Sequence, residues 1–249
     1  MTASSAVAST ISVTTFSTAD YQTKYGDLGG VIITETFADF AEMNVAGSGG
    51  AFDTQTVGTF QTLGGTGSGG TVKKADNTFT GQSGANPNDG SRLAIRDGDV
   101  FGRRSTNAIP GLAADDKFLD SNDTHGIAWD VDVGRDFRKI LLTLTDGADA
   151  GATVRVSTVQ GGLLTGAEFF QTQLNKNQKT VLIDFGALVQ GARIEFGNYT
   201  DDTFTAYRAN DGLSLDDIAV SAVPLPASFL LLGAALAGLG AVRRRKTAA

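Results

Sequence analysis

Apolar and polar residues alternate along much of the chain, most clearly in the range 127–133. The same period of two recurs in four later segments, 140–144, 154–156, 181–185 and 194–196. This period is typical of strands that bury one face. Turn signals rich in Gly, Asp and Asn separate the runs, and no convincing helix lies between them. The pattern predicts an all-β fold, and its short, regularly spaced strands favour an antiparallel jelly-roll β-sandwich.

Two glycine-rich ranges, 47–70 and 81–90, hold too few apolar residues to form core. We expect long surface loops there, with one strand at 57–63. The segment 1–30 is expected to be poorly ordered. A single β-sandwich domain should then span residues 31–222, which is long enough for a sizeable core.

Two segments indicate how this domain closes. An apolar strand at 31–37 opens it, and the range 213–220 ends it. In the second segment the apolar positions change phase between residues 215 and 218, so one extra residue sits at Asp216–Asp217. A β-bulge would supply such a residue.

The amino-acid composition excludes several classes of functional site and binding partner. The sequence contains no cysteine, which excludes a disulfide framework, a thiolate metal site and a cysteine nucleophile. Leaving out four cations near the C-terminus reduces the 20 basic residues to 16 against 27 acidic ones, a net charge of −11 for residues 1–242. Such a surface repels nucleic acid and anionic lipid and attracts divalent cations.

The C-terminal residues differ from the rest. Pro224 and Pro226 keep the residues before them extended and open to a protease. The following 16 residues, 227–242, are almost all apolar or small. As a helix they would span about 24 Å, against a hydrocarbon core of about 30 Å. The cytoplasmic anchor expected from the positive-inside rule consists of four cations: Arg243, Arg244, Arg245 and Lys246.

This tail resembles the PEP-CTERM class of bacterial sorting signals, in the variant whose motif reads VPLPA. The motif residues are Val223, Pro224, Leu225, Pro226 and Ala227. The resemblance implies that 223–249 is a sorting signal with a short transmembrane helix and an Arg-rich end. It also implies that the protein is a partner of an exosortase in a Gram-negative bacterium. Its contact with the inner membrane would be transient. The alternative is a simple permanent membrane anchor.

Members of this class enter the export pathway through an N-terminal signal peptide. Residues 1–20 contain no basic residue and no apolar run of the length that such a peptide needs. We therefore expect that the natural start lies upstream or that a leader has been removed.

The first and last strands of the expected domain resemble those of carbohydrate-binding-module-like jelly rolls, in the letters TF after the first and LDDI in the last. In such domains acidic residues of these strands hold a structural Ca²⁺. The resemblance places that ion at Glu35 and Asp217, with Asp216 as a further ligand. Two carboxylates would need carbonyl and water oxygens to complete the shell. The alternative is that Asp216 caps the bulge and Glu35 is merely exposed.

Catalysis has little support. His125 is the only histidine, which excludes sites that need several imidazoles. Asp130 and Asp132 are expected on one strand face roughly 7 Å apart, a separation suited to glycoside hydrolysis, but exposed strands often carry such pairs. Trp129 alternates in phase with the core positions. We expect no enzyme.

The expected function is a structural or adhesive role at the cell surface or in the extracellular matrix. The alternative is a glycan-binding module with extracellular polysaccharide as its partner. Jelly rolls bind sugars with aromatic and polar side chains. The candidates here are Tyr199, Tyr207 and Arg208. Aromatic residues in such a loop can equally pin it to the sandwich.

Overall fold

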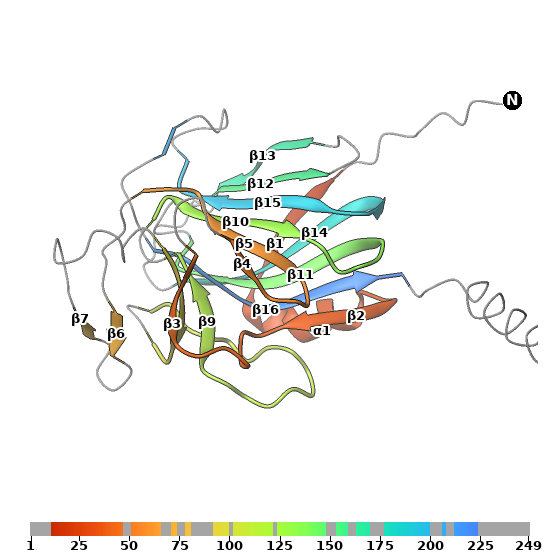
Figure 1. The fold of residues 1–249 in the computed structure, drawn as a ribbon. Coiled ribbons are helices and arrows are strands. Elements are labelled where there is room, and N and C mark those ends of the chain that lie inside the picture. Colours follow the sequence, from red (N-terminus) through yellow and green to blue (C-terminus); the bar gives the residue numbers. More distant parts are fainter. Residues whose placement is uncertain are drawn as a thin grey trace, which may run out of the picture.

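The computed structural model describes residues 11–46, 51–65, 71–73, 78–80, 92–99, 102–121, 124–147, 153–158, 163–169, 177–199, 206–207 and 212–223. These residues form two antiparallel β-sheets that pack as layers of a β-sandwich (Figure 1). The mostly-β fold and the two antiparallel sheets confirm the sequence prediction at that level.

The larger sheet has eight strands among the described residues. Its order is β1 (Ser12–Phe16), β14 (Gln178–Val189), β11 (Phe137–Thr145), β16 (Ser214–Ala222), β9 (Lys117–Asp120), β8 (Leu93–Asp97) and β3 (Met43–Ala46), with β2 (Val31–Glu35) also paired to β16.

The smaller sheet has six strands in the same described part of the chain. Its order is β13 (Leu163–Phe169), β12 (Thr153–Thr158), β15 (Ala192–Gly197), β10 (Gly126–Val131), β5 (Gly58–Thr62) and β4 (Phe52–Asp53). A separate hairpin joins β6 (Thr71–Lys73) to β7 (Thr78–Thr80).

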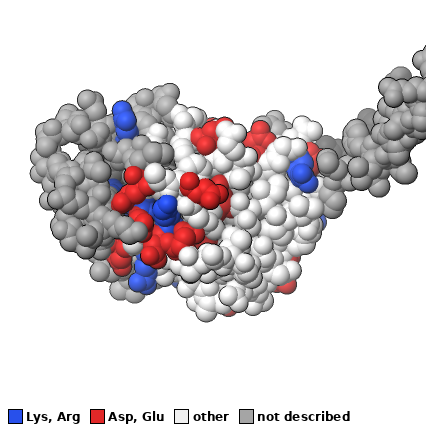
Figure 2. Space-filling model, turned by 60° about the horizontal axis from the view of Figure 1, so that its bottom comes forward, with Lys and Arg blue, Asp and Glu red and all other residues white. Residues whose placement is uncertain are grey.

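Charge is unevenly spread over the surface. On the face shown in Figure 2, acidic and basic side chains gather from the middle of the view toward the left. Fewer charged side chains lie toward the right, the side on which β16 ends in Figure 1. The end of the sandwich from which the C-terminus leaves is therefore comparatively uncharged on this face.

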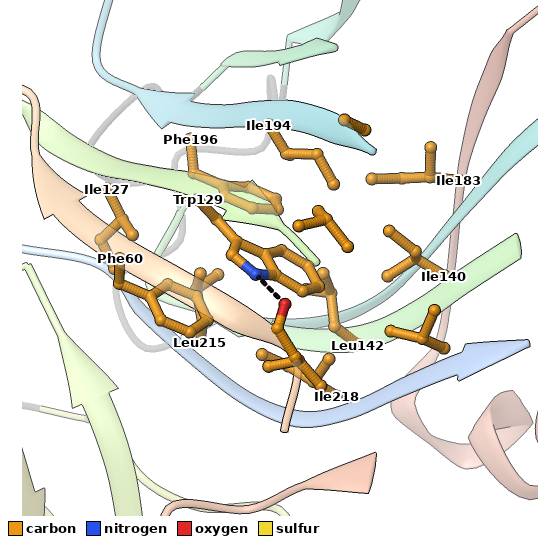
Figure 3. Packing of buried hydrophobic residues seen from close by; sticks show 14 of the residues in the cluster. Phe60, Ile127, Trp129, Ile140, Leu142, Ile183, Ile194, Phe196, Leu215 and Ile218 are labelled. Carbon is orange, nitrogen blue, oxygen red and sulfur yellow. Dashed lines mark hydrogen bonds between the residues drawn. The ribbon is translucent and has the colours of Figure 1, made fainter. Parts of the chain in front are cut away.

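The core lies between the two sheets and is built from the inward positions of each strand. Trp129 is fully buried at its centre and stacks on Phe60, with 5.3 Å between ring centroids (Figure 3). Its indole Nε1 donates to the Val57 carbonyl at 3.0 Å. Ile140 and Ile218 of the larger sheet belong to the same cluster. In the five segments where the sequence alternates, the apolar positions are the ones that face this core.

The two segments expected to close the domain are paired, although β1 precedes the one expected to open it. Strand β2 pairs antiparallel with β16, and Glu35 lies opposite Ile218. The predicted bulge is present as well, because the register between β11 and β16 shifts from Leu141 opposite Ala219 to Thr143 opposite Asp216. The bulge in β16 contains Asp217, whose φ of 49° lies in the left-handed region.

Residues 11–30 do not match the poorly ordered segment expected for 1–30. Strand β1 pairs with the edge of β14, and a 3₁₀ turn (Thr18–Asp20) leads into the short helix α1 (Tyr21–Gly26). Tyr21 is fully buried against the outer face of the larger sheet, where Leu141 and Ala219 belong to its cluster. The prediction was wrong for residues 11–30 because the pairing of β1 with a sheet edge and the burial of Tyr21 order this segment, and a strand of five residues leaves only a short pattern in the sequence.

The expected C-terminal helix and most of the sorting motif lie outside the described residues, which end at Val223. Within the described ranges, no helix has the length and apolar character that crossing a membrane requires.

Candidate functional site

The sorting junction begins where the last strand ends. Strand β16 stops at Ala222, and the backbone N–H of Val223 donates to the Asp136 carbonyl at 2.8 Å. Val223 is the first residue of the expected motif, so the domain holds the start of the motif by a backbone hydrogen bond. Of the motif and its cytoplasmic anchor, only Val223 lies within the described residues.

The three expected calcium ligands do not converge. Glu35 is directly opposite Ile218, a core residue, and so faces the interior of the sandwich. Its carboxylate accepts from the Phe37 N–H at 2.7 Å and from the Thr56 hydroxyl. Asp216 lies opposite Thr143, between core positions of β11, and therefore faces the outer side.

Asp217 belongs to the outer side too. It accepts from the Thr106 hydroxyl, and its backbone carbonyl accepts from the Tyr21 hydroxyl. Among the described residues, no three Asp, Glu, His or Cys side chains are grouped as a metal ion would require. Glu35, Asp216 and Asp217 therefore do not fit a single calcium site.

Asp216 is instead a buried carboxyl group. The residue is 2% exposed, and within the described part of the chain neither carboxylate oxygen has a hydrogen bond that meets full geometric criteria. Burial and the neighbouring charge of Asp217 raise its pKa well above the usual value, against an opposing contribution from Ser105. The pKa of Asp217 is raised as well, mainly by burial.

A pH dependence of stability follows from Asp216. Because its pKa is higher in the folded chain, folding is favoured fully below the unfolded value of about 4, and this contribution is lost as the pH rises through the folded pKa. Asp216→Asn should therefore raise the melting temperature at pH 7, by about 2–4 °C for each kcal/mol of relieved desolvation. Thermal unfolding between pH 4 and pH 8 measures this.

The gain should shrink toward pH 4, where the carboxyl is protonated in the folded chain and about half protonated in the unfolded one. Asp132→Asn is the matched control, since Asp132 is exposed and its Oδ1 accepts from the Gly134 N–H, which an asparagine oxygen can also do. An equal gain for Asp216→Asn at pH 4 and pH 7 would contradict this account.

Tyr199 and Tyr207 form an aromatic stack with His125. The Tyr199 and Tyr207 ring centroids are 4.8 Å apart, and those of Tyr207 and His125 are 4.4 Å apart. A backbone bridge also joins the two tyrosines. Tyr199 is 1% exposed, so its ring offers no free face to a sugar. Arg208 lies outside the described residues.

Room for the Tyr199 ring comes from a glycine. A Cβ at Gly197 would lie 2.6 Å from Tyr199 Cε2, closer than real side-chain contacts allow. Gly197 is the last residue of β15, so the ring folds back along the outer face of the smaller sheet. The stack therefore fixes residues 199 and 207 to the sheet, as the pinning alternative anticipated.

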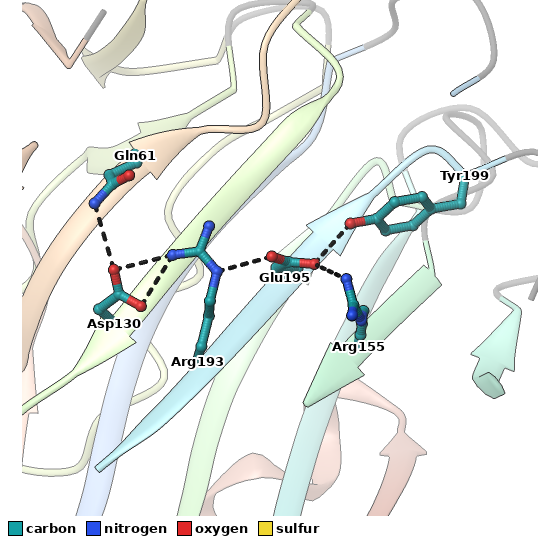
Figure 4. Close-up of polar contacts among 6 residues, drawn as sticks. All are labelled: Gln61, Asp130, Arg155, Arg193, Glu195 and Tyr199. Carbon is teal, nitrogen blue, oxygen red and sulfur yellow. Dashed lines mark hydrogen bonds and ion pairs between the residues drawn. The ribbon is translucent and has the colours of Figure 1, made fainter. Parts of the chain in front are cut away.

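A row of charged side chains continues from this stack across the smaller sheet (Figure 4). The Tyr199 hydroxyl donates to Glu195 at 2.8 Å, and Arg193 joins Glu195 (2.8 Å) to Asp130 (3.0 Å). Arg155 donates to Glu195 from β12 at 3.1 Å. Burial alone would raise the pKa of Glu195, but its bonds to Arg193 and Tyr199 and the charges of both arginines lower it.

The sequence did not reveal this row. Its members stand on four strands, with Gln61 of β5 at one end, and only Asp130 had been singled out. Alternation placed each of them outward, but pairing between strands decides which outward residues meet.

The residues considered for catalysis are occupied by structural contacts. Asp130 is bound by Arg193, and Asp132 accepts from the Gly134 N–H at 2.8 Å. His125 stacks on Tyr207, and burial lowers its pKa. Each side chain therefore has a role in the fold.

Comparison with known proteins identifies the C-terminus. Residues 222–246 match the family model described as the PEP-CTERM protein-sorting motif. The chain carries a PEP-CTERM sorting motif. No curated protein matches the chain.

The PEP-CTERM motif implies an exported bacterial protein that an exosortase processes and sorts to the cell surface. The match begins at Ala222, the last residue of β16, so the motif follows the folded domain without a spacer. The proline motif, the apolar run and all four cations expected from the sequence fall within the matched range.

Proposed function

We propose that this chain is a non-enzymatic structural or adhesive protein of the outer surface or extracellular matrix of a Gram-negative bacterium. The observation that carries the proposal is the PEP-CTERM match at residues 222–246, directly after the last strand of a β-sandwich. A β-sandwich whose charged side chains pair with one another across the smaller sheet suits a structural or adhesive role. Sorting by an exosortase would bring the protein to the cell surface.

The motif is of the VPLPA variant, since Val223 to Ala227 read VPLPA. The apolar run behind it is about 24 Å long as a helix, short of a hydrocarbon core of about 30 Å. Such a segment holds a protein in the inner membrane for a time and is then removed. The cations at 243–246 keep its end in the cytoplasm until cleavage.

The sandwich is a jelly roll similar to carbohydrate-binding modules. Four antiparallel pairs support this, and they nest within one another along the chain: β2 with β16, β10 with β15, β11 with β14, and β12 with β13. Nested pairs of this kind arise when one long hairpin is wrapped into two sheets, which gives two Greek keys.

The experiment that tests the sorting is mass spectrometry of the mature C-terminus from the surface fraction. The native protein should end near the VPLPA motif. Replacing Pro224 and Pro226 with alanine should leave the tail attached and the protein in the inner membrane, because the extended, protease-accessible conformation is lost.

Leu231→Ile is the matched control, since it keeps the hydrophobicity of the apolar run and leaves the motif intact. It should be processed like the native chain. A surface-bound native form that still contains residues 243–249 would contradict exosortase processing.

Polysaccharide binding is the second candidate. An open cleft of about 560 Å³ lies at the end of β10 beside the charged row, and its lining includes Asp53, Gln55, Thr59 and Asp130. Carboxylate, amide and hydroxyl groups of this kind can orient sugar hydroxyls. A glycan array tests it, and signals that Gln55→Ala abolishes would place binding in this cleft.

A further inference from the structure

The end of the larger sheet where β16 stops forms a distinct surface. Val189, Phe137, Ala222 and Val31 lie opposite one another across β14, β11, β16 and β2. We call the surface formed by residues 28–31, 135–138 and 186–189 the tail pole, because the C-terminal tail leaves from it at Val223.

The tail pole cannot lie far from the membrane while the tail is inserted. Val223 is held to the domain by its hydrogen bond to Asp136, and Phe229 is the first large apolar residue of the run at 227–242. Six residue spacings separate them, which reach roughly 20 Å when fully extended. The polar headgroup layer takes up about 5–8 Å of that length.

The chemistry of the tail pole suits a lipid surface. Val31 is 38% exposed and Leu188 is 50% exposed, and they are two of the three large apolar side chains exposed in the described part of the chain. Leu188 projects from a bulge, since Phe137 pairs with Val189 while Lys139 pairs with Asp184.

A cationic side chain accompanies the two apolar ones. Arg138 stands at the start of β11 with its side chain 53% exposed, 3.5 Å from Asp184. The body as a whole is acidic, but the tail side of the face in Figure 2 is sparsely charged. On that side of this face few carboxylates repel anionic headgroups, and residues 135–138 of the tail pole carry Arg135 and Arg138 beside one exposed carboxylate, Asp136.

We propose that, while the tail is inserted, the tail pole rests on the outer leaflet of the inner membrane, with Leu188 and Val31 at the interface and Arg138 among anionic headgroups. This rests on the proposed sorting. It gives the folded domain one orientation on the bilayer and holds the proline motif at the membrane surface, where an integral-membrane exosortase acts.

The sequence contains no cysteine, so single labels can be placed without removing native thiols. The full chain with Leu188→Cys would carry an environment-sensitive nitrobenzoxadiazole label in vesicles of phosphatidylethanolamine and phosphatidylglycerol that contain headgroup-nitroxide lipid. Lys179→Cys is the matched control, because Lys179 lies at the opposite end of the same strand. It pairs with Leu144, seven residues of β11 or roughly 24 Å from the tail pole.

The nitroxide should quench most of the fluorescence at position 188 and little at position 179. Equal quenching at both positions, in a chain that resists carbonate extraction, would overturn the proposed orientation and leave the sorting proposal standing. A chain that carbonate strips from the vesicles would overturn membrane insertion itself, and with it both proposals.

Discussion

Replacing Trp129 with alanine should lower the free energy of unfolding by about 3–5 kcal/mol, a large share of the 5–15 kcal/mol that a typical domain has. The indole is fully buried between the sheets and stacks on Phe60 at an interplanar angle of 14°. Its removal leaves a cavity that the paired strands on either side of β10 cannot collapse into. Urea unfolding of the full chain, followed by circular dichroism, measures the loss.

Trp129→Phe separates packing from hydrogen bonding. It keeps a ring in the core but loses the bond from Nε1 to the Val57 carbonyl. That carbonyl also accepts from the Asp132 N–H at 3.2 Å, so it does not become unsatisfied. The phenylalanine variant should therefore lose clearly less than the alanine variant. Equal losses would show that the hydrogen bond, not the packed ring, stabilises the core.

The sequence was most informative where the pattern has a period. The phase change between Leu215 and Ile218 predicted the bulge in β16, and the register confirms it. The same alternation placed Trp129 in the core. Both results follow because a strand with one buried face leaves its period in the sequence.

Predictions were less successful where they depended on contacts between different segments of the chain. The bulge that was foreseen places Asp216 and Asp217 on the outer face, while the pairing of β2 turns Glu35 inward. The resemblance of these two strands to carbohydrate-binding modules does not say on which face of the sheet each carboxylate lies. The burial of Tyr199 depended on the missing Cβ of Gly197, which a loop pattern does not show.

A buried ion cluster was likewise not predicted, because its members are distant in sequence. Asp120 of β9 pairs with Arg96 of β8, and its Oδ1 lies 3.2 Å from Nε of Arg103. Arg103 also lies 3.8 Å from Asp146. Arg96 and Asp120 are fully buried and Arg103 is 3% exposed. Single-sequence analysis treats each charge as a surface residue, so pairing of this kind stays hidden.

Asp120→Asn should destabilise the protein by about 3–5 kcal/mol, because the buried guanidinium groups of Arg96 and Arg103 both lose the charge of the carboxylate that they share. The size of the variant side chain is unchanged, so the loss reports charge and not volume. Chemical unfolding of the full chain at neutral pH measures it.

Asp99→Asn is the matched control. Asp99 also faces an arginine, at 3.8 Å from Arg104, but both side chains are about half exposed. Its Oδ1 accepts from the Gly102 N–H, which an asparagine oxygen can replace. An exposed pair contributes about 0–1 kcal/mol, so this variant should unfold almost like the native chain. If Asp120→Asn lost no more than this control, Arg96 and Arg103 would have to be neutralised by other groups, and Asp120 would not be the centre of the cluster.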